Sequence, residues 1–143
     1  MHDTADVVVI GGGVIGTSVA YYAARKGHSV ILAERNDIAA GTSGACDGFI
    51  IMQSKSPGPH LEMALKSAEI YRTLAEELDH DIEYNPSGGM VIIENEQQAE
   101  LMKQFVMKQG QSGLTVQILP IDEARKLEPM LAADLWGATY CRT

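Results

Sequence analysis

A glycine-rich turn directly after a short apolar run limits the fold of this chain more than any other feature. The run Val7–Ile10 reads VVVI and leads into three consecutive glycines, a pattern typical of a strand buried on both faces of a parallel sheet. The following segment, Val14–Lys26, has no proline and is mostly apolar or small, which predicts a helix that ends at Gly27. A second strand is expected over Ser29–Glu34. Together these elements predict a βαβ unit with parallel strands and a right-handed crossover.

The glycines of this turn have the spacing of a dinucleotide-binding motif. Gly11, Gly13 and Gly16 form G-x-G-x-x-G between the predicted strand and helix. Gly11 permits the tight turn, Gly13 lets the backbone approach a pyrophosphate, and Gly16 allows the helix to lie close to the strand. The free amides and partial positive charge of a helix N-terminus attract a diphosphate without a lysine. A P-loop NTPase is disfavoured because its Gly-Lys-Ser/Thr ending is absent.

An acidic residue ends the second predicted strand, where such motifs bind an adenosine ribose. Glu34 lies 18 positions after Gly16, close to the spacing at which a carboxylate accepts hydrogen bonds from the ribose hydroxyls. A carboxylate there would repel a 2′-phosphate, so NADP is the least expected dinucleotide, with Arg35 as the one opposing feature. The alternative is a purely structural turn with Glu34 as a surface charge. The context and spacing of the motif favour dinucleotide binding.

A second loop of small residues indicates FAD rather than NAD. The segment Ala39–Ala45 reads AAGTSGA and cannot build a core. Within it, Gly41-Thr42-Ser43-Gly44 would supply further N–H and O–H donors to the pyrophosphate of a longer, more deeply buried cofactor. A flexible surface loop is the alternative.

The rest of the chain predicts mixed helices and strands. Apolar residues at steps of three and four predict a helix over Pro59–Leu78. Two strands joined by a turn are expected over Ile82–Tyr84 and Met90–Glu94, followed by a helix over Glu96–Gln109. The last predicted elements are a strand over Leu114–Leu119, a helix over Ile121–Leu127 and a strand over Leu135–Cys141. The expected fold class is therefore α/β, with a Rossmann-like FAD-binding domain over residues 1–80 and the beginning of an α+β substrate domain over 81–143. Because the final strand has no closing element behind it, the chain is expected to be truncated.

Composition and charge exclude several classes of function. The 11 Lys and Arg residues against 19 Asp and Glu residues give a net charge of −8, which disfavours nucleic-acid binding by a broad basic surface. No apolar run reaches the ~18 to 20 residues of a membrane span, and the first residues lack the basic flank of a signal peptide, so a cytoplasmic location is expected. No metal site is predicted, because the cysteines and histidines match no ligand spacing.

The order of several segments resembles a known flavoprotein family. These are DVVVIGGGVIGTSVAYYAARKG, ILAER, GTSGACDG, SGGMVII, and LEP followed by LWGATYC. In this order they resemble the FAD-dependent D-amino acid oxidase superfamily, especially its glycine oxidase, sarcosine oxidase beta subunit and opine or hydroxyproline dehydrogenase branch. The resemblance implies FAD as cofactor, a small amine or amino acid as substrate, and hydride transfer from the amine-bearing carbon to the flavin. In this family the residues that hold the substrate lie mainly in the C-terminal half, so no catalytic residue is assigned in this chain.

The resemblance also implies which residues contact the cofactor. Besides the three glycines of the motif, it places Val14 and Ile15 beside the diphosphate, Glu34 and Arg35 at the adenosine, Thr42 and Ser43 at the pyrophosphate, and Asp47 and Gly48 near the flavin. The family more often has Ala-Gly or Asn-Ala-Gly where this chain has Cys46-Asp47-Gly48, so a contact through the backbone is expected there. Two alternatives stay open: an NAD-binding module of a dehydrogenase, and a noncatalytic nucleotide-binding fragment or subunit. The resemblance leaves homo- and hetero-oligomers equally open.

Overall fold

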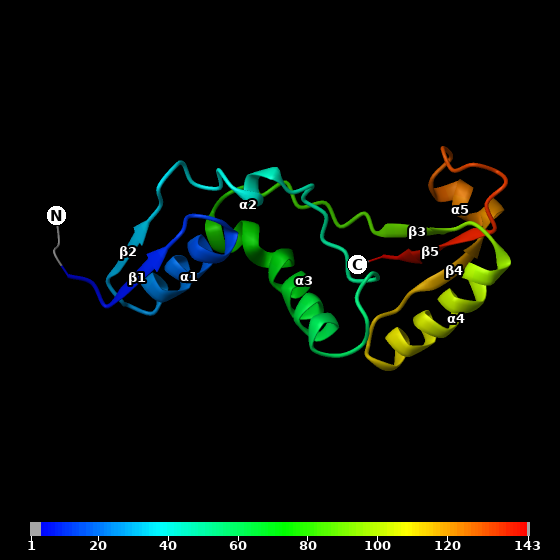
Figure 1. Ribbon diagram of the computed structural model, residues 1–143, viewed down its shortest axis with the longest axis horizontal. Coiled ribbons are helices and arrows are strands. Elements are labelled where there is room, and N and C mark those ends of the chain that lie inside the picture. The colour runs from blue at the N-terminus through cyan, green and yellow to red at the C-terminus, as the bar shows by residue number, and fades with distance from the viewer. Residues whose placement is uncertain (1–3, 143) are drawn as a thin grey trace. The chain divides into compact units, whose positions relative to one another are not determined.

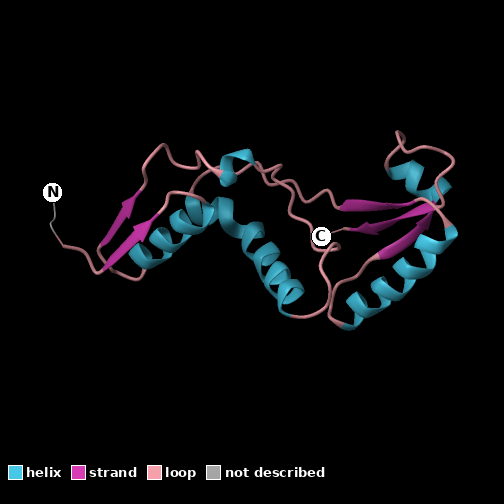
Figure 2. Ribbon diagram, in the orientation of Figure 1, coloured by secondary structure: helices cyan, strands magenta, loops and turns pink. Residues whose placement is uncertain are grey.

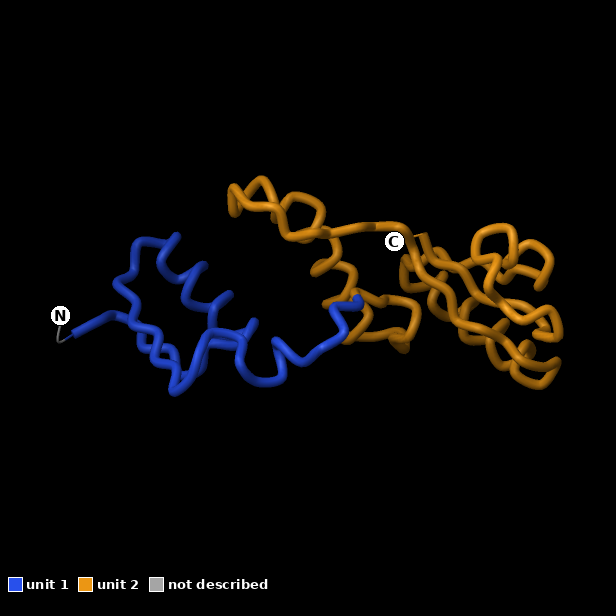
Figure 3. The backbone as a smooth tube through the Cα atoms, turned by 90° about the horizontal axis from the view of Figure 1, so that it is seen from above, with its two compact units in different colours: residues 1–49 blue, residues 50–143 orange. Residues whose placement is uncertain are grey.

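A computed structural model describes residues 4–142 (Figures 1 and 2). The chain divides into two compact units, Met1–Phe49 and Ile50–Thr143, coloured separately in Figure 3. The first contains the glycine motif and the second contains the longer helices and a three-stranded sheet. The predicted domain boundary between residues 80 and 81 concerns the domains of a complete enzyme and stays a prediction.

Unit 1 contains the predicted βαβ arrangement. Strand β1 (Val7–Ile10) pairs in parallel with β2 (Val30–Ala33), with Val7 opposite Val30 and Ile10 opposite Ala33. Helix α1 (Val14–Arg25) connects them, and Gly27 adopts a positive φ of 88° just beyond it. The sequence therefore predicted the order and type of these three elements correctly. The α/β fold class is confirmed.

Burial of the two strands of unit 1 differs from the prediction. Val9 is 9% exposed, but Val8 is 60% and Ile10 is 88% exposed. Because side chains alternate between the two faces of a strand, Val8 and Ile10 share one face of this two-stranded sheet. The predicted burial on both faces is therefore absent among the described residues, in which β1 has a single neighbouring strand.

Unit 2 begins with a buried segment and a long helix. Helix α3 spans Pro59–Leu78, as predicted, and buries Leu61 and Ala68. These two side chains form a core with Met52, Leu114 and Cys141. The helix begins with proline at its first position, where the missing N–H costs no hydrogen bond. It ends at Asp79, which adopts the left-handed conformation with φ 49° and stops further helical hydrogen bonding.

The sheet of unit 2 is antiparallel and is built from segments far apart in sequence. Its strand order is β3 (Gly89–Ile93), β5 (Gly137–Cys141) and β4 (Gln117–Pro120). Helix α4 (Glu96–Gln111) follows β3, and the short helix α5 (Ile121–Leu127) follows β4. Four of the five residues of the central strand β5 are buried. This agrees with the α+β arrangement expected after the βαβ unit, with shifts of one to three residues at several element ends.

The predicted strand over Ile82–Tyr84 is wrong. Glu83 has φ 55°, whereas a strand requires an extended backbone with negative φ. Its amide donates to Asp81 Oδ1 at 2.8 Å, a local turn that replaces pairing with another strand. The predicted hairpin partner, β3, instead pairs with β5, where Gly89 lies opposite Cys141. The alternation of Ile82, Glu83 and Tyr84 is typical of a strand, but the turn at Glu83 sets the backbone of this segment.

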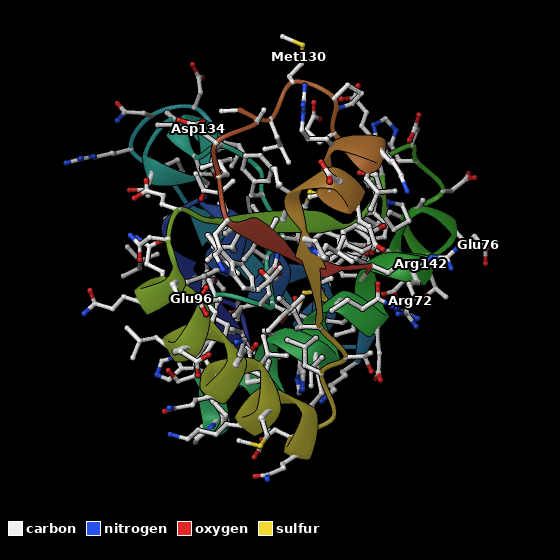
Figure 4. All side chains as sticks on the ribbon, turned by 90° about the vertical axis from the view of Figure 1, so that its right-hand side faces the viewer. Arg72, Glu76, Glu96, Met130, Asp134 and Arg142 are labelled. Atoms are coloured by element: carbon white, nitrogen blue, oxygen red, sulfur yellow. The ribbon has the colours of Figure 1, made fainter. Side chains whose placement is uncertain are left out.

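A tryptophan links α4 to the sheet of unit 2. Trp136 Nε1 donates to Glu96 Oε2 at 2.5 Å, and the Trp136 amide donates to Ile93 O at 3.0 Å. Glu96 is in the first turn of α4, as Figure 4 shows. Lys103 Nζ lies 5.5 Å from the centre of the indole ring, which adds a cation–π contact. Because Trp136 is the single tryptophan of the chain, its fluorescence reports on unit 2 alone.

Over residues 4–142, no helix combines the length and the apolar character needed to cross a bilayer.

Candidate cofactor site

The glycine turn places the N-terminus of α1 beside the end of the sheet of unit 1. Gly11 has φ 106°, which a side chain would rarely allow, and its amide donates to Ala33 O at 2.8 Å. Gly13 is the N-cap residue of α1, and it has no side chain to cap the first turn. Val14 and Ile15 follow it with exposed fractions of 57% and 78%. The side chains of the first two residues of the helix are therefore largely exposed within the described residues.

Gly16 permits close packing between α1 and the turn before it. A Cβ atom at this position would lie 1.9 Å from Gly11 O and 3.4 Å from Val9 Cγ1. The first of these contacts is far shorter than any that real structures contain, and a backbone oxygen cannot rotate away from it. The close approach of helix and strand predicted for Gly16 is therefore present.

The second small-residue loop contacts the first glycine turn directly. It forms one short helical turn, α2 (Thr42–Ala45), where the sequence predicted a loop. The Val14 amide donates to Ser43 Oγ at 2.9 Å, and a Cβ on Gly13 would lie 3.0 Å from the same oxygen. The structure thus brings Ser43 to the N-terminus of α1. Thr42 lies in the same turn.

Glu34 connects the end of β2 to the glycine turn. Its Oε2 accepts from the Gly12 amide at 2.7 Å, and its Oε1 accepts from the Asn36 amide at 2.9 Å. Hydrogen bonds to the charged form, first from Gly12 and then from Asn36, lower the pKa of Glu34 below its usual value of 4.5. The neighbouring Arg35 amide and guanidinium lower this pKa further. Glu34 is therefore held as a carboxylate at the edge of the candidate site.

Gly12, to which the dinucleotide-binding motif assigns no role, is a packing residue in the structure. A Cβ on Gly12 would lie 2.6 Å from Ile38 Cδ1 and 3.2 Å from Glu34 Cβ. The Gly12 carbonyl also accepts from the Ala39 amide at 2.9 Å. The signal available in the sequence was the middle one of the three consecutive glycines, a position at which the six-residue motif does not require glycine.

The proposed flavin-contacting residues lie in a loop at the end of unit 1. Asp47 Oδ1 accepts from the Phe49 amide at 3.3 Å, and Gly48 has φ 70°. Cys46 is exposed, and its thiol donates to Ser43 O at 3.2 Å. The structure thus brings Gly13, Val14 and Ser43 together at the start of α1. A hydrogen bond to Gly12 connects Glu34 to the same glycine turn. No hydrogen bond in the described residues ties Asp47 or Gly48 to these groups.

Comparison with models of protein families identifies the family of this chain. The family model described as FAD dependent oxidoreductase, abbreviated DAO, matches residues 6–143. The chain belongs to this family. FAD is the cofactor of these oxidoreductases, in agreement with the prediction from the sequence.

Individual relatives are similar to this chain over nearly all of its length. Glycine oxidase of Geobacillus kaustophilus is 34% identical, over 94% of this chain and 38% of the relative. The crystal structure of glycine oxidase from Bacillus cereus superposes with a TM-score of 0.89 and 34% identity, covering 98% of this chain and 39% of that chain. The mitochondrial pyruvate dehydrogenase phosphatase regulatory subunit of Mus musculus is 29% identical, over 95% of this chain and 16% of the relative. The chain therefore spans well under half the length of these relatives.

The residues at the start of α1 fit the diphosphate of FAD. Gly13 has no Cβ to occupy the space at the helix N-terminus, and its extended backbone, φ −80° and ψ 179°, points the following amides along the helix axis. Ser43 Oγ accepts one hydrogen bond from Val14. A hydroxyl still has its own hydrogen to donate, which a phosphate oxygen can accept.

The lowered pKa of Glu34 makes its contribution to stability depend on pH. A carboxylate whose folded-state pKa is depressed stabilises the fold above the unfolded pKa, and this stabilisation is lost as the pH falls through the folded pKa. We expect Glu34→Gln to lower the melting temperature when the pH is well above 4.5, and this difference to shrink as the pH falls below 4.5. Thermal melts of both proteins across this range measure the difference. The pKa of Asp6 is also lowered, by hydrogen bonds from Ser29, but Asp6 is present in both proteins, so its contribution cancels in the difference. A difference that is independent of pH would contradict the assignment.

Proposed function

We propose that this FAD-dependent oxidoreductase oxidises a small amine or amino acid, and that this chain supplies the N-terminal part of its FAD-binding domain. The observation that carries the proposal is the junction of Gly13, Val14 and Ser43 at the start of α1, in a chain 34% identical to a glycine oxidase. Because the relatives extend well beyond this chain, the activity, substrate and partners belong to the proposal.

Each proposed cofactor contact follows from the chemistry of the residue. Val14 and Ile15 would lie beside the diphosphate, which the Ile15 amide and the hydroxyls of Thr42 and Ser43 would face, while the Val14 amide donates to Ser43 Oγ. Glu34 would accept hydrogen bonds from the ribose hydroxyls of the adenosine, with Arg35 beside it. Asp47 and Gly48 would approach the flavin through their backbone. Gly11, Gly13 and Gly16 would shape the turn that receives the diphosphate.

The reaction assigns different tasks to the cofactor and the protein. Bound FAD would supply a hydride acceptor for the substrate carbon that bears the nitrogen, and water would hydrolyse the imine that results. The residues of this chain bind and orient the dinucleotide, so that its reactive ring is held in one place. Orientation of this kind contributes several kcal/mol to lowering a reaction barrier. The groups that hold the substrate carboxylate and amine are proposed to lie beyond residue 143.

A noncatalytic role is the second candidate. It is favoured by the similarity to a protein whose name describes a regulatory subunit. In this case the chain would bind FAD or a related nucleotide without turnover of an amine. Partner proteins, in a homo- or hetero-oligomer, would then respond to whether the nucleotide is bound.

A flavin titration followed by an amine screen tests the proposal. The purified chain is titrated with FAD and with NAD, and the visible spectrum and flavin fluorescence are recorded. A longer form of the protein that continues past Thr143 is measured beside it, and is then mixed with glycine, sarcosine or proline under anaerobic conditions. We expect FAD binding, no NAD binding and bleaching of the flavin by one of these amines. FAD binding without bleaching by any amine would favour the noncatalytic role. Binding of NAD alone would overturn the assignment.

A further inference from the structure

Charged residues from a helix and from the sheet line one cavity of unit 2. Its volume is about 660 Å³, within the roughly 300 to 1,000 Å³ that small-molecule sites occupy. Glu69 and Arg72 come from α3, Tyr140 comes from β5, and Arg142 directly follows that strand. Every residue that lines the cavity belongs to unit 2. The site is therefore described by the structure of a single unit.

Helix α3 presents one face to this cavity. Leu65, Ala68, Glu69 and Arg72 line it, and steps of three and four residues place side chains on the same face of a helix. Ala68 is 4% exposed and packs in the core of unit 2 with Met52 and Leu65. The core thus fixes the face that carries the two charged side chains.

The sheet supplies the other charged side chain of the cavity. Gln117 of β4 lies opposite Tyr140 of β5 in the antiparallel pairing, and both line the cavity. Arg142 is two positions after Tyr140, the spacing at which side chains point to the same face of an extended chain. Cys141 between them is 2% exposed and belongs to the core. Arg142 is therefore held next to a buried anchor.

The two arginines of the cavity have no carboxylate partner. Within residues 4–142, no ion pair involves Arg72 or Arg142, and Figure 4 shows both side chains on the same side of unit 2. A guanidinium has five N–H donors in a planar fork and can bind a carboxylate through two of them. In a chain with a net charge of −8, the pair forms a local positive site that attracts anions.

Glu69 adds a negative charge to the same cavity. It is the one acidic residue among the described residues that line it. Glu69 lies three positions before Arg72 on α3, a spacing that allows an ion pair, but the described residues contain no such pair. Its carboxylate is therefore available to accept hydrogen bonds from an ammonium group. The cavity offers two positive charges and one negative charge to a ligand.

We propose that this cavity binds a small dicarboxylate that carries a protonated amine. Arg72 and Arg142 each bind one carboxylate of the ligand, and Glu69 accepts hydrogen bonds from its ammonium group. The buried side chains of Met52 and Leu114 line the same cavity and suit the methylene groups between the charges. The inference goes beyond the proposed function, because the residues proposed to contact FAD all lie in unit 1.

Calorimetric titration of the whole chain without FAD tests the ligand class. The probes are L-glutamate and L-aspartate, with glutarate, which lacks the amine, 4-aminobutyrate, which lacks one carboxylate, and inorganic phosphate. We expect L-glutamate or L-aspartate to bind with a Kd roughly tenfold or more below those of the other three compounds. Binding of neither amino acid would overturn the proposal. Equally tight binding of phosphate would also overturn it, because the arginines would then form an unspecific anion site.

Substitutions test the role of each charged residue. Arg72→Met and Arg142→Met should each raise the Kd of the amino acid that binds by roughly tenfold. Arg125→Met, at an exposed arginine of α5 outside the cavity, is the matched control and should leave this Kd unchanged. Glu69→Gln should weaken binding of the amino acid and preserve or strengthen binding of glutarate, since only the former has an ammonium group. Melting temperatures establish that each variant is folded.

The pattern of affinities decides the outcome. An unchanged Kd in both arginine variants would overturn the site, and equal weakening in Arg125→Met would reduce the effect to net charge. If Glu69→Gln weakened glutarate and the amino acid alike, the assignment of the ammonium group would be wrong. None of these measurements includes FAD, so their failure and a failure of the proposed function are distinguishable.

Discussion

Gly16→Ala is expected to destabilise unit 1 strongly while leaving unit 2 folded. The new Cβ would lie 1.9 Å from Gly11 O, so α1 must move away from β1 or the glycine turn must change shape. Overpacking of this kind costs about 1 to 3 kcal/mol, and sometimes more. Unit 1 has little buried apolar surface to offset this loss of stability, since Val9 is the one buried hydrophobic residue among its described residues. A small domain loses roughly 4 to 8 °C in melting temperature per kcal/mol.

The measurement uses signals that separate the two units. Far-UV circular dichroism follows the loss of α1, and the fluorescence of Trp136 follows unit 2. Gly110→Ala is the matched control, because a Cβ at Gly110 in α4 meets nothing within 4 Å. Replacement of a helical glycine by alanine at an open position stabilises by about 0.5 to 1 kcal/mol. The two glycine-to-alanine changes should therefore have opposite signs. Equal melting of Gly16→Ala and the unsubstituted protein would show that the close packing is absent in solution.

Patterns within a short stretch of sequence predicted those helices and strands that are determined by neighbouring residues. The bounds of α3 and α5 follow from their apolar spacing and from the prolines beside them, and β1 follows from a run of β-branched residues before glycine. The strand expected over Ile82–Tyr84 failed because its backbone is set by turn residues, Asp81 among them. The pairing of β3 with β5 could not be predicted, because it joins Gly89 to Cys141 across most of unit 2. Nothing near either strand specifies its partner.

The same distinction applies to the candidate site. Gly11, Gly16 and Glu34 were identifiable because a motif with fixed spacing assigns each of them a task. The bond from the Val14 amide to Ser43 Oγ joins residues 29 positions apart, and the sequence indicated only that both segments suit a pyrophosphate. The burial of Gln109, whose Nε2 donates to Gln53 O and Lys55 O, had no signal in the sequence. Gln109 lies in a helix whose other glutamines are exposed or half-buried, and only the folded structure shows that it is buried.

Gly13→Val is expected to abolish FAD binding in a chain that still folds. Gly13 has φ −80° and ψ 179°, which a β-branched residue adopts without strain, so the backbone does not require glycine here. The control is Gly110→Ala in α4, outside the candidate site, where an added Cβ meets nothing within 4 Å. FAD binding by that variant should be close to that of the unsubstituted protein.

The reason for the loss is the space that the new side chain would occupy. A Cβ on Gly13 would already lie 3.0 Å from Ser43 Oγ, and the two methyl groups of valine would add further bulk beside the first amides of α1. A phosphate that is held by those amides must approach within hydrogen-bond distance of them, about 2.9 Å. Valine would therefore exclude the diphosphate and displace the Ser43 hydroxyl together. Flavin fluorescence titration measures the affinity, and circular dichroism checks the fold. Unchanged flavin affinity in Gly13→Val would contradict binding of the diphosphate at the start of α1, because the valine side chain would occupy the space that the glycine leaves open there.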